Sequence, residues 1–194
     1  MARKSKNIQE KDRFIIVCGA EETEPNYFRN YKELMEQNSD FELEIVKESK
    51  SPTYVLNKAI ELKTKYDNIN QIWCVFDKDD FNDFDSVIER GKKEGIKTAY
   101  SNEAFEIWFL FHYEYTTGFL NRKDYKNKLA KYLGKNYKKN DKTIFDIIKK
   151  NQDKAIFNAK QAYQYHRRDN KKPSESNPET TVFELIEELN KWIR

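Results

Sequence analysis

The sequence predicts an α/β protein in which helices flank a parallel sheet and a basic helical region follows. Short apolar runs alternate with amphipathic helical patterns over the first 120 residues, which indicates parallel strands joined by right-handed crossovers. From Asn121 onward only helical patterns remain and lysine becomes frequent. We therefore expect a polar tail at 1–12, an α/β core at 13–120 and a helical region at 121–194 that packs on the core.

The strands of the first half differ in their apolar patterns. Continuous apolar runs at 14–18 and 72–76 are typical of strands buried on both faces, whereas the alternation at 41–46 suits an edge strand. A further strand is expected at 96–101. We identify the helices by the spacing of their apolar residues, by prolines suited to a first helical turn and by a glycine that ends one of them. The expected helices are 25–37, 51–66, 85–94, 104–113, 123–133, 143–149, 152–168 and 180–193.

The net charge of +3 hides a strong asymmetry along the chain. The segment 121–172 holds 17 Lys and Arg against five Asp and Glu, so it is strongly basic and the rest of the chain is acidic. This segment predicts either a track for a phosphate backbone or a solvated lysine-rich face. Its aromatic residues either stack on bases or belong to the core. The candidate phosphate contacts are Lys138, Lys139, Arg167, Arg168, Lys171 and Lys172, and the aromatic residues are Tyr125, Tyr132, Tyr137, Phe145, Tyr163 and Tyr165.

The cysteine content and the first residues point to a cytoplasmic protein. Cys18 and Cys74 lie inside apolar strands, where they are expected to be small core residues in a reducing compartment. The sequence has no Cys/His cluster typical of a zinc site. The start, MARKSKNIQEKDR, has no apolar signal segment, and no apolar run is long enough to span a bilayer, so no membrane association is expected.

Acidic residues follow two of the predicted buried strands. Because parallel strands end at the same edge of a sheet, we expect Glu21 and Glu24 to lie near Asp77, Asp79 and Asp80. Asp77 and Asp79 are two residues apart and can share a hard cation, for which Mg²⁺ (or Mn²⁺) is best suited. The alternative is an acidic, solvated loop with one Asp capping the next helix.

Three further titratable residues are candidates for the site. Glu106 lies in the apolar segment AFEIWFLF and needs a partner, which is either the cation and an attacking water or a salt bridge to a lysine or Arg13. His112 is expected to pack in the core. His166 is expected to be exposed, where it contacts phosphate or has no role.

Four stretches of the chain resemble the RloB-like family: VCGAEETEPNYF, IWCVFDKDD, SNEAFEIWFLFHY and NPETTVFELIEEL. They occur in the family's order and span nearly the whole chain. Members of that family accompany restriction–modification and abortive-infection systems, and the family is similar to Toprim domains, which are Mg²⁺-dependent α/β modules. The resemblance implies that Asp77 and Asp79 form the Asp-x-Asp of such a site, and that Asn102, Phe105 and Glu106 fall in its third motif.

The chain departs from the family pattern at two positions. Gly19 stands where the family usually has the glutamate of the Toprim site, so either Glu21 or Glu24 supplies that carboxylate or the catalytic role is lost. Glu103 stands where the family often has proline.

The resemblance implies a metal-dependent nuclease that cleaves DNA or RNA in phage defence. Asp77 and Asp79 would hold Mg²⁺, with Asp80 and Glu21 as further ligands, and Glu21 or Glu24 would serve as the general acid or base. A nearby-encoded ATPase and a second copy of the chain are the partners that the family suggests. The alternative is a binding or regulatory module that kept the fold without the chemistry. A HAD-like phosphatase fits less well, because that motif normally continues differently after its Asp-x-Asp.

Overall fold

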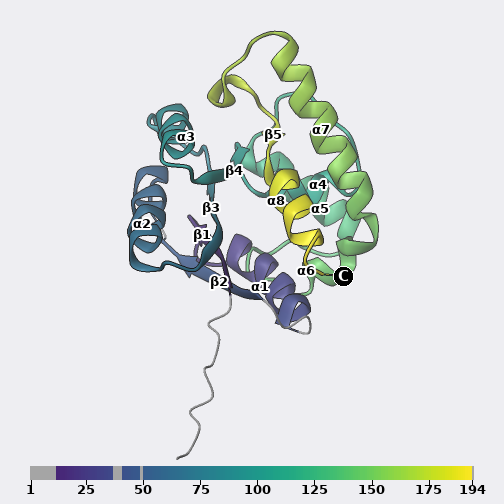
Figure 1. Ribbon diagram of the computed structural model, residues 1–194. Coiled ribbons are helices and arrows are strands. Elements are labelled where there is room, and N and C mark those ends of the chain that lie inside the picture. The colour runs from purple at the N-terminus through teal and green to yellow at the C-terminus, as the bar shows by residue number, and fades with distance from the viewer. Residues whose placement is uncertain (1–11, 37–40, 49, 194) are drawn as a thin grey trace, which may run out of the picture.

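A five-stranded sheet forms the centre of the protein (Figure 1). The computed structural model describes residues 12–36, 41–48 and 50–193. The strand order is β2-β1-β3-β4-β5; the first four strands are parallel and β5 runs antiparallel to β4, so the predicted α/β class with a mostly parallel sheet is confirmed. The strands are β1 (Asp12–Cys18), β2 (Phe41–Lys47), β3 (Ile69–Asp77), β4 (Lys97–Asn102) and β5 (Glu179–Thr180).

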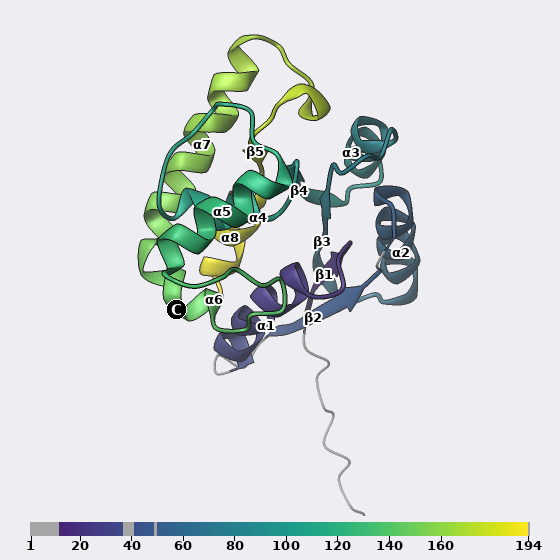
Figure 2. The same cartoon turned by 180° about the vertical axis from the view of Figure 1, so that it is seen from behind.

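Helices cover both faces of the sheet (Figures 1 and 2). One apolar cluster lies between the sheet and α2 and α3, and a larger one lies between the opposite face and the remaining helices. The first layer consists of α2 (Pro52–Lys65) and α3 (Phe84–Lys93). The second consists of α1 (Thr23–Glu36), α4 (Glu106–Phe111), α5 (Arg122–Leu133), α6 (Ile144–Ile148), α7 (Gln152–Arg168) and α8 (Val182–Asn190).

The continuous apolar sequence of β1 follows from this two-sided cover. Phe14 and Ile16 belong to the larger cluster, whereas Ile15 and Val17 point to the other face and pack with α2. All four are fully buried. By contrast β2, at the edge of the sheet, keeps an alternating pattern, as the sequence predicts.

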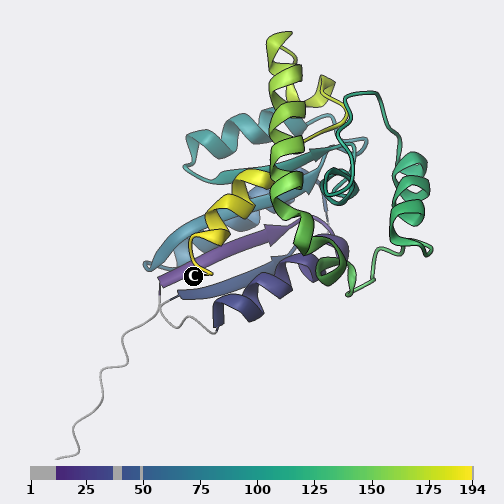
Figure 3. The ribbon, with the colours of Figure 1, turned by 90° about the vertical axis from the view of Figure 1, so that its right-hand side faces the viewer.

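The short helix α4 is buried on every side. All six of its residues are buried, including Trp108, and it lies between the sheet and α7. Figure 3 shows the parallel strands ending on the side of the molecule where α4 and α7 lie. An all-round apolar helix is expected to be buried in this way. No helix in the described part of the chain is long and apolar enough to cross a bilayer.

The second half adds one short strand to the expected helices. β5 pairs with the end of β4, where the hydroxyl groups of Ser101 and Thr180 lie 2.9 Å apart and the Thr181 amide donates to the Tyr100 carbonyl at 2.9 Å. A strand of two residues gives no periodic pattern, so the sequence alone does not reveal it. The core is therefore shared by both halves of the chain, since residues from α1 and α8 belong to one apolar cluster.

The turn-rich segment between α7 and β5 is tied to the core. The Ser174 backbone amide and hydroxyl donate to the Asp85 carboxylate at 3.0 and 2.5 Å. Arg167, in the last turn of α7, pairs at 2.5 Å with Glu179, whose side chain is fully buried. The Tyr100 hydroxyl donates to the same Glu179 oxygen at 2.9 Å. Burial raises the pKa of Glu179 to about 7, and Arg167 opposes that shift.

We expect Arg167→Ala to lower the free energy of unfolding by roughly 3–5 kcal/mol, because it leaves Glu179 buried without its cationic partner. Urea unfolding followed by circular dichroism measures this loss. Arg168→Ala is the matched control: its exposed side chain predicts a change within about 0.5 kcal/mol. Equal stabilities of the two variants would contradict a structural role for the Arg167–Glu179 pair.

Candidate metal centre

Three acidic side chains gather where β1, β3 and β4 end. Glu24 lies in the first turn of α1, which follows β1. Asp77 is the last residue of β3, and Glu106 is the first residue of α4, which follows β4. Because β1, β3 and β4 are parallel neighbours, all three residues are delivered to one edge of the sheet. We call these residues the carboxylate triad.

Two residues of the carboxylate triad are shielded from water, and Asp77 is half-buried. Glu24 is 1% exposed and Glu106 is 5% exposed. The Tyr137 hydroxyl donates to Glu106 Oε1 at 3.0 Å. In contrast, Glu24 Oε2 and Asp77 Oδ1 are buried with no hydrogen-bond partner among the described residues. An ionised carboxylate that is buried without a partner is costly, so these two oxygens need an explanation.

The pKa values of Glu24 and Asp77 reflect both burial and repulsion by neighbouring carboxylates. Burial raises the pKa of Glu24 to about 7, and the nearby Glu106 charge adds to this rise. Burial, followed by repulsion from Glu24 and Glu106, holds the pKa of Asp77 well above its usual range. Two cations act in the opposite direction: Lys139 favours ionised Glu24 and Arg122 favours ionised Asp77.

The carboxylate triad suits a hard divalent cation. Mg²⁺ takes one or two carboxylates and keeps several waters, and the two oxygens of Glu24 and Asp77 that lack hydrogen bonds are ligands of the right chemistry. Across residues 12–36, 41–48 and 50–193 no three acidic, imidazole or thiol groups form a ready-made metal cluster. What suits a cation here is therefore the oxygen chemistry of Glu24 and Asp77 and the hydrogen bonds that these two oxygens lack.

The other acidic candidates lie outside the carboxylate triad. Asp79 has a left-handed backbone, with φ of 46°, and its carboxylate forms an ion pair with Arg122. Asp80 and Glu21 are exposed. Glu24 and Glu106 thus act on Asp77, whereas Asp79 is paired with Arg122, and Asp80 and Glu21 are exposed.

Asn102 and Gly19 have roles in packing. The Asn102 amide donates to the carbonyls of Pro173 and Ser174, at 2.9 and 3.1 Å, and so fastens the segment before β5. A Cβ atom at Gly19 would lie 3.3 Å from Val55 Cγ2 and 3.3 Å from Phe76 Cβ, in the apolar layer beneath α2. A side chain at position 19 would therefore start toward α2, on the opposite face from α1 and α4.

The candidate basic residues divide into three groups. Lys138, Arg168 and Lys172 are exposed, and Lys139 is exposed but close enough to Glu24 to influence its pKa. Arg167 is engaged with Glu179 in the core, as described above. Lys171 is half-buried beside a cleft at the strand ends.

The two histidines are both buried. His112 packs against Trp108, its Nδ1 lies 2.9 Å from the Trp108 carbonyl, and burial lowers its pKa to about 4, as suits a core histidine. His166 is only 2% exposed, although the sequence predicts an exposed side chain. The last turn of α7 is covered by the segment that returns to β5, which sequence spacing does not reveal.

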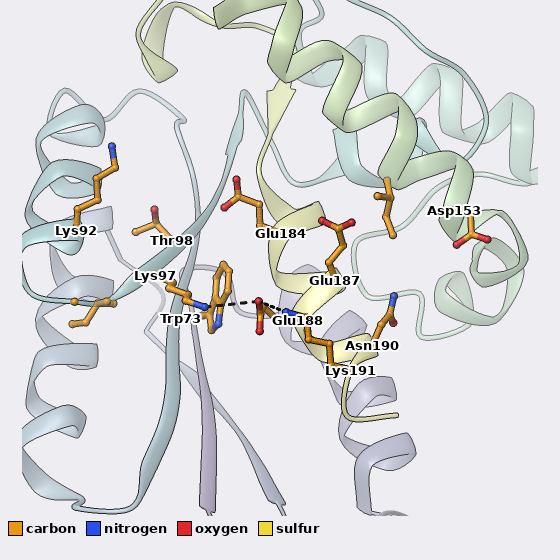
Figure 4. Close-up of a pocket in the computed structure, with 13 residues that line it drawn as sticks. Trp73, Lys92, Lys97, Thr98, Asp153, Glu184, Glu187, Glu188, Asn190 and Lys191 are labelled. Carbon is orange, nitrogen blue, oxygen red and sulfur yellow. Dashed lines mark hydrogen bonds and ion pairs between the residues drawn. The ribbon is translucent and has the colours of Figure 1, made fainter. Parts of the chain in front are cut away.

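Two hollows flank β4. The first, which we call the strand-end cleft, has a volume of about 540 Å³ and is lined by residues 78–80, 102–103, parts of 117–119 and 171–177, and the end of α7. The second is a groove of about 1090 Å³ beside the start of β4 (Figure 4). Figure 4 shows Glu188 of α8 joined to Lys97 and Lys191, at 4.0 and 2.7 Å. The strand-end cleft, and not this larger groove, is lined by Lys78, the residue that follows Asp77.

Two residues near the carboxylate triad were not predicted from the sequence. Arg122 pairs with Asp79, lies 3.9 Å from Glu103 and also acts on Asp77. Tyr137 holds Glu106. Both come from the basic second half, where they resemble many other cationic and aromatic residues, so no sequence signal distinguishes them.

In EDTA, we expect the free energy of unfolding of the wild type to fall as the pH rises above about 4.5, the ordinary pKa of a glutamate. The part of this fall that Glu24 causes should be complete once the pH passes about 7, which is the pKa of Glu24 in the folded protein. The sign follows because the folded state holds the Glu24 proton more tightly than the unfolded state. At pH 8, Glu24→Gln should therefore raise the free energy of unfolding by roughly 1–3 kcal/mol. The exposed Glu22→Gln should change little, and a less stable Glu24→Gln variant would contradict the repulsion.

Comparison with known proteins gives one match. Neither the curated proteins nor the solved structures yield a relative. Residues 14–189, nearly the whole chain, match the family described as RloB-like protein. The matched span contains all three residues of the carboxylate triad and the two cations that act on them. The chain therefore belongs to the RloB-like protein family.

Proposed function

We propose that this protein is a metal-dependent nuclease whose centre is the carboxylate triad. The observation that carries the proposal is the pair of buried oxygens, Glu24 Oε2 and Asp77 Oδ1, that have no hydrogen-bond partner in the described part of the chain. Membership of the RloB-like family supports the proposal through the family's likeness to Toprim domains. A role in phage defence, with a partner ATPase and a second copy of the chain, is part of the same proposal.

The energetics favour a function for the triad over a structural role. Glu24 and Asp77 are each repelled by neighbouring carboxylates, and burial penalises the charge on both. Apolar residues of similar size would be more stable there, since buried charges rarely add net stability. Groups with pKa values raised by burial and by each other cluster at functional sites.

The residues around the triad suit phosphoryl transfer. A bound divalent cation would neutralise charge on the phosphate and orient the nucleophile. Tyr137 fixes Glu106 through its hydroxyl, so that the second carboxylate oxygen is free to accept a proton from a water. Lys139 and Arg122 bring positive charge to Glu24 and Asp77, where a phosphate would lie.

Nucleic acid is the substrate class that the charge distribution favours. The segment 121–172 holds 17 Lys and Arg against five Asp and Glu. Its exposed lysines include Lys138 and Lys139, and Lys139 acts directly on Glu24. Cations of this kind hold the backbone without reading its sequence. The same chemistry serves DNA and RNA.

The alternative is a binding module without turnover, which Gly19 suggests because the family usually has a glutamate there. The direction of the Cβ at Gly19, toward Val55 and Phe76, argues that a residue here would not join Asp77. Glu24, whose charge acts on Asp77, is the carboxylate that we propose for that role. This geometry favours the enzyme over the binding module.

We expect Asp77→Asn to abolish Mg²⁺- or Mn²⁺-stimulated cleavage of labelled DNA and RNA, with a loss of at least a hundredfold, and to weaken Mn²⁺ binding at least tenfold in calorimetry. Removing the Asp77 charge takes away one proposed ligand and leaves the side-chain volume unchanged. Asp67→Asn, an exposed residue before β3, is the matched control and should cleave like the wild type.

The same samples separate the proposed functions. Mn²⁺ binding without cleavage of any substrate identifies the binding module, and full activity in EDTA or in Asp77→Asn rules out the metal centre. Asp77→Asn should also be at least as stable as the wild type in EDTA at pH 8, because one repelling charge is gone. An Asp77→Asn variant that lost activity because it misfolded would instead be less stable than the wild type.

A further inference from the structure

The strand-end cleft has the features of a site for an uncharged, flat ligand. Its volume of about 540 Å³ falls within the roughly 300–1,000 Å³ usual for small-molecule sites. Lys78 and Lys171 line it together with four acidic side chains, two of which lie close to Arg122, so the lining has no excess of positive charge that would favour a phosphate group. The acidic side chains of the lining are Asp79, Asp80, Glu103 and Glu175.

Two exposed aromatic rings line this cleft. Phe119, from the loop between α4 and α5, is 73% exposed, and Tyr165, from the last turn of α7, is 44% exposed. Aromatic side chains are common in the lining of ligand sites. Any of the nucleobases can stack on such rings, and each stacked base contributes about 1–3 kcal/mol to the binding free energy.

His166 supplies polar groups within the same cleft. It is 2% exposed and lines the cleft, and neither ring nitrogen has a hydrogen-bond partner of good geometry among the described residues, although the nearby Pro178 backbone favours the protonated ring. Its ring packs at right angles against Tyr165, with centroids 5.3 Å apart. Burial and the nearby Lys171 lower its pKa, so the ring stays neutral and offers one donor and one acceptor. A ligand with complementary groups would satisfy a residue that is otherwise costly to bury.

We propose that the strand-end cleft binds one unstacked base of a single-stranded nucleic acid, with Phe119 and Tyr165 as stacking surfaces and His166 contacting the base edge. Arg122 lies between this cleft and the carboxylate triad, because it pairs with Asp79 of the cleft and acts on Asp77. The backbone of the bound nucleotide is thereby placed next to the proposed metal centre. This inference rests on the proposed function, since it names the form of the substrate.

The test measures the binding of fluorescently labelled twelve-residue single strands of DNA and of RNA by anisotropy, in EDTA so that no turnover occurs. We expect Phe119→Ala and Tyr165→Ala each to weaken binding roughly tenfold, within the stacking range of about 1–3 kcal/mol. The matched control is Phe157→Ala, which removes another exposed ring of α7 outside the cleft and should bind like the wild type. The DNA and RNA arms show which backbone is preferred.

Further variants and a duplex control show whether the inference holds. Wild-type affinity in both cleft variants, or tighter binding to a blunt duplex of the same length, would overturn the inference. His166→Leu should reduce the difference in affinity among the homopolymers dA12, dC12 and dT12, and an unchanged difference removes His166 from the site. In the Asp77→Asn background, Phe119→Ala and Tyr165→Ala should weaken binding by the same factor as in the wild type, so an inactive nuclease that still needs Phe119 and Tyr165 keeps this inference and loses only the proposed activity.

Discussion

The repulsion among Glu24, Asp77 and Glu106, of which the first and last are buried and Asp77 is half-buried, is the constraint on which the strand-end edge depends. Parallel strands must end together, and here the residues that follow them are Glu24, Asp77 and Glu106. Their surroundings are arranged to make this charge tolerable: a tyrosine hydroxyl holds Glu106, and a lysine and an arginine lie near the other two. The energy stored in this arrangement is what a cation would release on binding.

The neutralising groups come from the other half of the chain. The carboxylates follow strands of the α/β core, whereas Arg122, Tyr137 and Lys139 belong to the basic segment around α5. β5 and α8 return to the sheet and share its larger apolar cluster. The basic region is thus part of one folded unit with the core, and it completes the site instead of only flanking it.

Local patterns explain what the sequence predicted and what it did not. Apolar runs identified β1 and β3, and the meeting of their acidic ends follows from parallel topology. The sequence did not distinguish Glu21 from Glu24, because it predicted that the helix begins at Pro25. In the structure α1 begins two residues earlier, at Thr23, so Glu24 lies in its first turn and is buried. The Arg122–Asp79 pair and the burial of His166 arise from contacts between segments distant in sequence, for which periodicity gives no signal.

The late position of β5 in the chain has a consequence for biosynthesis. Domains form during translation in order from the amino terminus, at about 5–20 residues per second. The acidic strand ends leave the ribosome first, but Arg122, Lys139 and Tyr137 emerge afterwards, and residues 166–180, which wall the cleft and complete the sheet, emerge last of these. The acidic strand ends therefore stay without the lysine, arginine and tyrosine that offset their charge until most of the chain has been made.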